Sequence, residues 1–211
     1  MFFRIAQIFF RIYFLLYHRV SIKGLPRLKN FLAGRGGEPV ILAANHESYL
    51  DPPLIGMLFP YSIRFIAWDG LFRNPIFGAL IRALGAVSVS QENKNLAASL
   101  LRDTIEFIKS GYSVLIFPEG ERTRDGKLLP FEGGVALISS KTRTPIVPVW
   151  VDTFEAYPIH NKIPRPWRVV VEFGEPIFPE SLPPEMPEKE RREALLAALR
   201  KSLEEMRDRK A

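Results

Sequence analysis

The feature of this sequence that most restricts its fold is the alternation of short apolar runs with segments of helical periodicity. The apolar runs are rich in β-branched and aromatic residues and are bounded by turn-forming residues, so they predict strands. They are Val20–Lys23, Pro39–Ala44, Ile63–Ala67, Ala86–Ser90, Ser113–Phe117, Ile146–Val151 and Arg168–Phe173. Such alternation is typical of α/β proteins, in which helices cover a mostly parallel sheet.

Three of the intervening segments have a clear helical pattern. Leu96–Lys109 places apolar residues at helical spacing and stops before Gly111, a residue type that commonly terminates helices. Gly133–Lys141 is a shorter helix, and Glu188–Asp208 is a charged amphipathic helix. A chain of 211 residues without internal repeats has the length of one sizeable domain. We therefore predict one α/β domain over residues 20–211, with a mostly parallel mixed sheet flanked by helices.

Residues 2–19 form an apolar segment of a different kind. The longest uninterrupted apolar run, Ile12–Tyr17, is far shorter than the roughly 20 residues that cross a bilayer. No small-residue cleavage site of a secretory signal follows it. Polar side chains interrupt the segment at helical spacing and form one narrow stripe, which consists of Arg4, Gln7, Arg11 and His18. The segment is therefore predicted to be an amphipathic helix.

Two interpretations of this helix compete. It either docks on its own domain as a core helix or lies in the headgroup plane of a membrane. The apolar arc is much wider than the polar stripe, and the polar positions are mainly basic, which favours the membrane. We therefore expect residues 1–19 to be a membrane-interfacial helix. The residues expected to contact lipid are Phe2, Phe3, Arg4, Phe9, Phe10, Arg11 and Phe14.

The net charge of +6 indicates an anionic partner, such as nucleic acid, a membrane surface or a phosphorylated small molecule. The whole excess lies in residues 1–100, because acidic and basic side chains balance in the remainder. These basic residues lie among Phe and Leu side chains, and the sequence contains no nucleic-acid-binding motif. Membrane lipids are therefore the expected anionic partner, and nucleic acid is not expected to bind.

The absence of cysteine excludes several kinds of chemistry. It rules out a disulfide scaffold, a thiolate metal site and an acyl-cysteine intermediate. The histidines are His18, His46 and His160, too few to favour a multi-histidine metal site. His160 lies in a Pro-flanked loop without a carboxylate motif, so it is interpreted as a surface residue. We expect neither a metal ion nor a cofactor.

The first motif with catalytic potential is NHESYLD at Asn45–Asp51, directly after the apolar run Val40–Ala44. In α/β proteins, sites form at the carboxyl ends of strands. A carboxylate fixes the tautomer of an imidazole and stabilises the imidazolium, so His46 with Asp51 suits proton abstraction near neutral pH. Taken alone, the pair is more typical of a turn histidine followed by Asp51 as a helix N-cap.

A second motif, FPEGER, occupies residues 117–122 and also follows an apolar strand. Pro118 ends that strand, and Gly120 lets the backbone approach a ligand closely. Arg122 provides a planar guanidinium group that suits phosphate. On its own, a loop of this composition is typical of a solvated turn.

Together, the two motifs and their separation resemble the glycerolipid acyltransferase family, which includes 1-acylglycerol-3-phosphate acyltransferases and bacterial lysophospholipid acyltransferases. In that family an Asn-His-x4-Asp motif is followed by Phe-Pro-Glu-Gly-x-Arg and then by a Pro-Ile-Val-Pro-Val strand. The corresponding positions here are Asn45–Asp51, Phe117–Arg122 and Pro145–Val149. The resemblance covers roughly residues 20–178.

This resemblance implies an O-acyltransferase of phospholipid biosynthesis or remodelling that forms no covalent acyl-enzyme. His46 would be the general base and Asp51 its orienting partner. The acceptor would be a lysophospholipid such as 1-acylglycerol-3-phosphate, and the donor acyl-CoA or acyl-carrier protein. The protein would be a peripheral enzyme on the cytoplasmic face of the cell membrane. The residues implied in substrate binding are Asn45, Glu119, Gly120 and Arg122.

Three positions that are often basic in this family hold Trp68, Gln91 and Glu132 here. They leave the acceptor headgroup open between a phosphate and a phosphodiester or amine. The apolar residues 52–85 are either ordinary core or a wall for a lipid tail, with arginines near the headgroup. A non-catalytic lipid-binding protein with the same fold is the alternative to the enzyme.

Overall fold

The computed structural model describes residues 2–89 and 96–209, and the strands in these ranges form one seven-stranded sheet. In order across the sheet, they are β1 (Arg19–Lys23), β7 (Arg168–Phe173), β6 (Ile146–Asp152), β2 (Ile41–Ala44), β5 (Ser113–Ile116), β3 (Ile63–Trp68) and β4 (Ala86–Val89). Every neighbouring pair is parallel except β6 and β7, which are antiparallel. The predicted mostly parallel mixed sheet is therefore confirmed.

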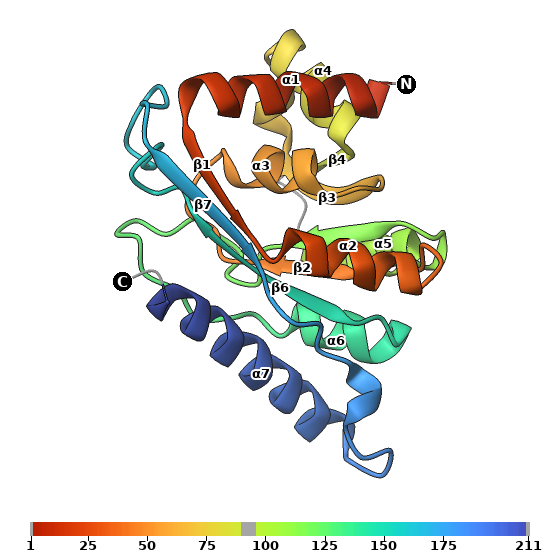
Figure 1. Ribbon diagram of the computed structural model, residues 1–211. Helices are drawn as coiled ribbons and strands as arrows, with labels where there is room; N and C mark the ends of the chain where they lie inside the picture. Colours follow the sequence, from red (N-terminus) through yellow and green to blue (C-terminus); the bar gives the residue numbers. More distant parts are fainter. Residues whose placement is uncertain (1, 90–95, 210–211) are drawn as a thin grey trace.

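Helices cover both faces of the sheet, so the fold has three layers (Figure 1). One face carries α1 (Phe2–Tyr17), α2 (Leu25–Gly34), α3 (Asp51–Leu58) and α4 (Pro75–Leu84). The other face carries α5 (Leu96–Lys109), α6 (Gly134–Thr142) and α7 (Glu188–Asp208). The described elements also include short 3-10 turns at Asp69–Phe72 and Pro179–Ser181.

The strands and the amphipathic helices have nearly the bounds that the sequence predicts. Leu96–Lys109 and Glu188–Asp208 are helices with these limits, although Ser90, the predicted end of one strand, lies outside the described residues. The sequence predicts no helix for residues 52–85 beyond a helix start near Asp51, yet α3 and α4 form there. Helix α3 is buried over nearly its whole length and lacks the polar face that makes a helix recognisable. For α3, ordinary core is therefore the correct interpretation.

Helix α1 docks on α3 and α4 with one of its faces. Phe10 and Phe14 are only 5% and 0% exposed and belong to the main hydrophobic core. The prediction that these two side chains contact lipid is wrong, because they cover the apolar surface of the helices beneath them. Phe3 is half-buried against the same core.

Part of the polar stripe of α1 also faces inward. The side-chain amide of Gln7 donates to the carbonyl oxygen of Gly56 at 3.1 Å, and Arg11 Nε donates to that of Met57 at 3.1 Å. These carbonyl groups lie in the last turn of α3, where a helix leaves acceptors without intrahelical partners. Gln7 and Arg11 of the stripe therefore cap the carboxyl end of α3. Gln7 and His18 are buried, so two of the four stripe positions face the protein interior.

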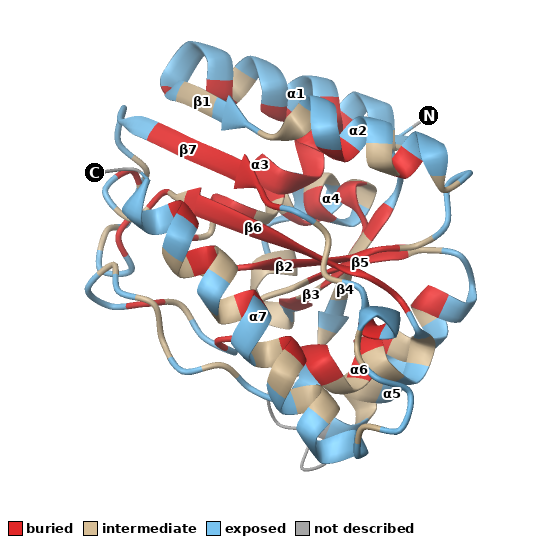
Figure 2. Cartoon of the chain, turned by 60° about the horizontal axis from the view of Figure 1, so that its bottom comes forward, coloured by how far each residue is buried: buried red, intermediate tan, exposed pale blue. Residues whose placement is uncertain are grey.

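The outward face of α1 carries apolar side chains. The pale blue parts of this helix in Figure 2 show that this face is exposed. Its most exposed side chains are Leu15 and Leu16, at 78% and 80%. A contiguous exposed apolar surface commonly marks a binding surface. Among residues 2–89 and 96–209, no helix is long and apolar enough to cross a membrane. Helix α1 is thus docked like a core helix and keeps a wide apolar face directed away from the domain.

The two faces of α1 predict different effects of neighbouring substitutions. Phe14→Ala is expected to lower the free energy of unfolding by about 3–5 kcal/mol, because it leaves a cavity in the core. Leu15→Ala is the matched control and is expected to change it by less than about 0.5 kcal/mol. Urea unfolding followed by circular dichroism measures both. Equal effects of the two substitutions would contradict the docking of α1.

Candidate active site

The two sequence motifs meet at one edge of the sheet because their strands are neighbours. β2 lies between β5 and β6, and the three strands are parallel. Their carboxyl ends therefore reach the same edge, which is where α/β proteins form their sites. Asn45–Leu50 follow β2, residues 117–133 follow β5, and Thr153 follows β6.

His46 and Asp51 form the predicted pair. His46 Nδ1 lies 2.8 Å from Asp51 Oδ2. Because that oxygen also accepts two backbone N–H groups, Nδ1 carries the proton of this hydrogen bond. Nε2 then has a free lone pair and no hydrogen-bond partner among the residues that the structure describes. The ring stacks on Phe117 with 3.9 Å between centroids, so the imidazole is held in the orientation of a general base.

The Asp51 carboxylate is fully buried, and donors surround both of its oxygens. Oδ2 accepts the backbone N–H groups of Glu47 at 2.7 Å and Ser48 at 2.9 Å. Oδ1 accepts the hydroxyl groups of Ser48 and Thr153. These donors lie outside α3, so Asp51 does not act as the N-cap of that helix. Thr153 belongs to neither sequence motif, and only the order of the strands places it beside Asp51.

Asn45 and Glu47 fasten the first motif to the end of β6. The Asn45 side chain donates to the carbonyl oxygen of Val151 at 2.9 Å and accepts the N–H of the same residue at 2.7 Å. Glu47 accepts the N–H groups of Thr153 at 2.6 Å and Phe154 at 2.8 Å. The Asn45 amide is buried and used within the protein. The structure thus replaces the expected substrate contact of Asn45 with a supporting role.

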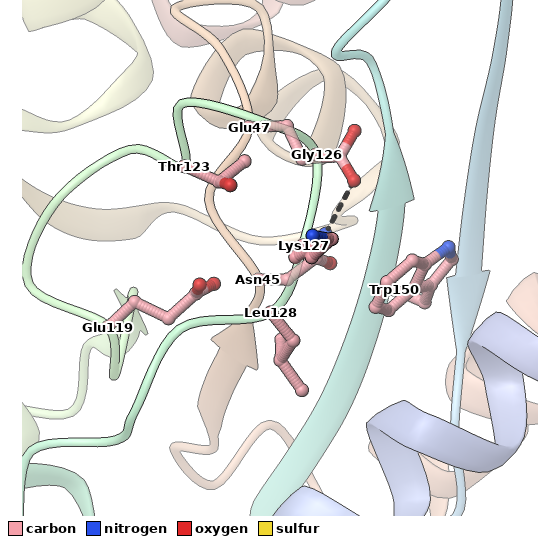
Figure 3. Close-up of a pocket in the computed structure, with 8 residues that line it drawn as sticks. All are labelled: Asn45, Glu47, Glu119, Thr123, Gly126, Lys127, Leu128 and Trp150. Carbon is pink, nitrogen blue, oxygen red and sulfur yellow. Dashed lines mark hydrogen bonds between the residues drawn. The ribbon is translucent and has the colours of Figure 1, made fainter.

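This polar cluster is a packed support for the two loops. Figure 3 shows Asn45 and Glu47 joined by a hydrogen bond of 3.2 Å, with Glu119, Leu128 and Trp150 around them. The side chains leave no space for a water molecule between them. The imidazole of His46 is partly exposed and is therefore accessible from outside this cluster.

Burial raises the pKa of Glu47 from 4.5 to about 8, and the nearby Asp51 carboxylate contributes in the same direction. The backbone donors of Thr153 and Phe154 stabilise the anion and lower the pKa, but they do not cancel the desolvation. Glu47 therefore binds a proton near neutral pH in the folded protein, whereas the same side chain is ionised in the unfolded chain.

The second motif clamps the backbone of His46. Glu119 accepts the N–H of His46 at 2.8 Å with one oxygen and the N–H of Leu129 at 2.6 Å with the other. The N–H of Thr123 donates to the carbonyl oxygen of His46 at 2.9 Å. Burial raises the pKa of Glu119, and the two backbone donors oppose this shift. Since Glu119 is buried between the loops, it shapes the site by positioning them and not by direct contact with a substrate.

Gly120 and Arg122 lie on the outer side of the second loop. Gly120 has a φ of +73°, a conformation that favours glycine, and its N–H donates to the carbonyl oxygen of Phe117 at 3.1 Å. The guanidinium carbon of Arg122 lies 3.6 Å from the ring centroid of Tyr49. Arg122 forms no ion pair with a described residue, so its hydrogen-bond donors are available to an anion.

The other residues named in the sequence analysis lie outside the two motifs. Trp68 ends β3 and is 42% exposed, and Glu132 is exposed in the loop after β5, while Gln91 lies outside the described residues. His160 is exposed, as predicted for a surface residue. Within residues 2–89 and 96–209, no three His, Cys, Asp or Glu side chains are arranged to hold a metal ion.

A comparison with protein families identifies the class to which this fold and site belong. The family model described as Acyltransferase matches residues 19–152, which is more than half of the chain. The chain belongs to the acyltransferase family.

Two similar proteins of this class are both named 1-acyl-sn-glycerol-3-phosphate acyltransferase. A chloroplastic 1-acyl-sn-glycerol-3-phosphate acyltransferase of Brassica napus is 32% identical over 133 residues, which are 63% of this chain and 37% of that protein. The chain thus spans little more than a third of that plant relative. The 1-acyl-sn-glycerol-3-phosphate acyltransferase of Bacillus subtilis is 27% identical over 192 residues, covering 85% of this chain and 92% of that one.

A solved structure has the same architecture. The crystal structure of the 1-acyl-sn-glycerophosphate acyltransferase PlsC from Thermotoga maritima superimposes with a TM-score of 0.73 and 28% sequence identity. The match covers 97% of this chain and 79% of the other. It confirms the fold class over nearly the whole length.

The raised pKa of Glu47 predicts how stability depends on pH. The folded-state pKa of Glu47, about 8, lies above the ordinary value of 4.5. Its contribution to the free energy of unfolding is therefore complete below pH 4.5 and is lost as the pH rises through 8. Glu47→Gln resembles the protonated side chain at every pH and is expected to flatten this fall.

Urea unfolding of both proteins between pH 5 and pH 9 measures the effect. The exposed Glu121→Gln, in the neighbouring loop, is the matched control and should keep the wild-type slope. An unchanged slope in Glu47→Gln would contradict the proton uptake.

Proposed function

We propose that the protein is an O-acyltransferase that moves a fatty acyl group from acyl-CoA or acyl-carrier protein to the free hydroxyl group of a lysophospholipid. One observation carries the proposal. The imidazole of His46 is fixed through Nδ1 by a buried carboxylate at 2.8 Å where the two family motifs meet, while Nε2 has no partner among the described residues. This is the arrangement needed to deprotonate a hydroxyl group.

The reaction follows from that arrangement. His46 Nε2 accepts the proton of the acceptor hydroxyl as its oxygen attacks the thioester carbonyl carbon. A carbon–oxygen bond forms, the carbon–sulfur bond breaks, and the imidazolium returns the proton to the leaving thiolate. Asp51 stabilises the imidazolium during this step. The chain contains no cysteine, and direct transfer needs no acyl-enzyme.

The acceptor that the site supports best carries a phosphate group. Arg122 has hydrogen-bond donors without partners among the described residues, and the relatives are named for 1-acyl-sn-glycerol-3-phosphate. Exposed Glu132 adds negative charge to the same loop, which favours a larger headgroup with a phosphodiester or amine as the second candidate. A panel of lysophospholipids with acyl-CoA and acyl-carrier protein as donors distinguishes these substrates.

We also propose that the outward apolar face of α1 holds the protein on the membrane that contains its substrates, as a peripheral protein on the cytoplasmic face. The supporting observation is the row of exposed aliphatic side chains on this helix. The lipid contacts proposed from the sequence then move from Phe10 and Phe14 to the neighbouring outward side chains. They include Phe2, Ile5, Ile8, Phe9, Ile12, Leu15 and Leu16.

Replacement of the base tests the reaction. His46→Ala is expected to lower the rate of acyl transfer to lysophospholipid about 10²–10⁴-fold, because it removes the group that accepts the proton. Release of free thiol from acyl-CoA in detergent micelles measures the rate. His160→Ala, which removes an exposed histidine outside both motifs, is the control and should keep full activity. Full activity in His46→Ala would contradict the mechanism, and no turnover in the wild-type protein would favour the non-catalytic alternative.

Replacement of outward side chains tests the membrane contact. Ile8→Ser, Ile12→Ser and Leu15→Ser together are expected to weaken sedimentation with phospholipid vesicles, because less apolar area enters the bilayer. The unfolding free energy should stay near that of the wild type, since these side chains do not contribute to the core. Unchanged vesicle binding would place the membrane contact elsewhere.

A further inference from the structure

An open groove of about 520 Å³ lies where the end of α1 meets the beginnings of β1 and β7. Leu15 and Leu16 of α1 line one side, and Trp167 lies in the segment before β7. Arg19 and Arg168, the first residues of the two strands, complete this part of the lining. None of these residues belongs to the His46 site.

The two arginines lie side by side. Arg19 and Arg168 are partners in the register of the parallel strands β1 and β7, and both are exposed. Neither forms an ion pair with a described residue, whereas Arg165 of the preceding loop is paired with Glu155 at 2.6 Å. Like charges at neighbouring sheet positions repel each other. An anion bound between the two guanidinium groups would relieve this repulsion.

The positive charge of the groove comes from these arginines alone among its lining residues. His18 also lines the groove, but burial lowers its pKa below the ordinary 6.5, so the ring is neutral near pH 7. Its Nε2 lies 3.2 Å from the hydroxyl group of Tyr13. Guanidinium groups are planar donors whose geometry matches phosphate oxygens.

Apolar side chains border the arginines. Leu15 and Leu16 are 78% and 80% exposed, and they continue the outward face of α1. Trp167 is 49% exposed, and tryptophan is enriched at the level of lipid headgroups in membrane proteins. Cationic groups next to exposed leucine and tryptophan match the boundary between headgroups and acyl chains better than they match a soluble anion.

The groove also lies on the same edge of the sheet as the active site. β7 runs against β6, and Val170 pairs with Asp152, so the beginning of β7 is level with the carboxyl end of β6. In Figure 1 the beginnings of β1 and β7 lie together at the upper left, beside the end of α1. Ala44 at the end of β2 is level with Val149 and Phe173, so the spacing and rise of strands place Arg168 and Arg19 roughly 20 Å from the end of β2.

We propose that this groove binds the phosphate group of an anionic phospholipid in the bilayer, with Arg19 and Arg168 on the phosphate and the neighbouring leucines among the upper acyl chain atoms. The bound lipid is not the reacting one, whose proposed phosphate contact is Arg122. It orients the sheet edge that carries His46 toward the membrane. This inference rests on the proposed action at a membrane and adds a lipid class and a site to it.

A double variant, Arg19→Gln with Arg168→Gln, tests the site. Its affinity for phosphatidylcholine vesicles containing phosphatidylglycerol is expected to fall about tenfold or more, because each basic group near an anionic surface contributes about 1 kcal/mol. Its affinity for pure phosphatidylcholine vesicles should stay unchanged. The control, Arg102→Gln with Lys141→Gln, removes the same charge from exposed positions on α5 and α6 and should keep the wild-type preference.

Three further readouts distinguish the possible results. The melting temperature of the double variant without lipid should equal or exceed that of the wild type, which separates loss of the site from misfolding. Glycerol phosphate at constant ionic strength should not displace the wild type from vesicles, and displacement would overturn the proposal in favour of a soluble anion. A retained preference for phosphatidylglycerol, or an equal loss in the control, would overturn it as well.

Acyl transfer in detergent micelles should persist in the double variant, and its absence in the wild type would contradict the proposed function instead.

Discussion

The geometry of the site depends on one buried carboxylate. Removing a carboxylate from water costs several kcal/mol unless hydrogen bonds replace its hydration. Asp51 is 0% exposed, and the replacement donors are His46, two backbone N–H groups and two hydroxyl groups. The backbone at Glu47 and Ser48 must therefore turn its N–H groups toward Asp51, and this turn fixes the conformation of the loop that carries the base.

The parallel order of β5, β2 and β6 brings the other hydrogen-bond partners of the His46 loop to the same edge of the sheet. Each carboxyl end contributes polar atoms that the first motif uses, and these contacts tie together segments that are far apart in the chain. Glu119 after β5 binds the backbone of His46, and Thr153 after β6 binds Asp51. Most polar side chains of the two motifs are thus hydrogen-bonded to one another or to the residues at the end of β6. His46 Nε2 and the Arg122 guanidinium group are left free among the described contacts, and these are the groups that the proposed reaction uses.

The sequence predicts the strands and the contact between His46 and Asp51 well, because both are local patterns. Buried parallel strands give short continuous apolar runs, and His46 and Asp51 are close in the chain. The residues that support the site are harder to predict from the sequence, because their roles depend on contacts between strands. Asn45 directly follows β2, at a position where a substrate-binding residue is expected. Because β6 is the neighbour of β2, the Asn45 side chain binds the backbone of Val151 instead. Phe10 is indistinguishable from its neighbours by residue type, and only the docking direction of α1 buries it.

Helix α1 and the His46 site are connected through α3. Gln7 donates to the carbonyl oxygens of Gly56 and Phe59 at the carboxyl end of α3, and Asp51 is the first residue of the same helix. A helix of this length is about 12 Å long, so the cap and the carboxylate lie at the two ends of one short rigid element. Because α1 is docked by hydrogen bonds as well as by packing, the direction of its outward apolar face is fixed relative to His46. A bilayer that binds this face would therefore meet the site in one orientation, which is what an enzyme acting on a lipid headgroup needs.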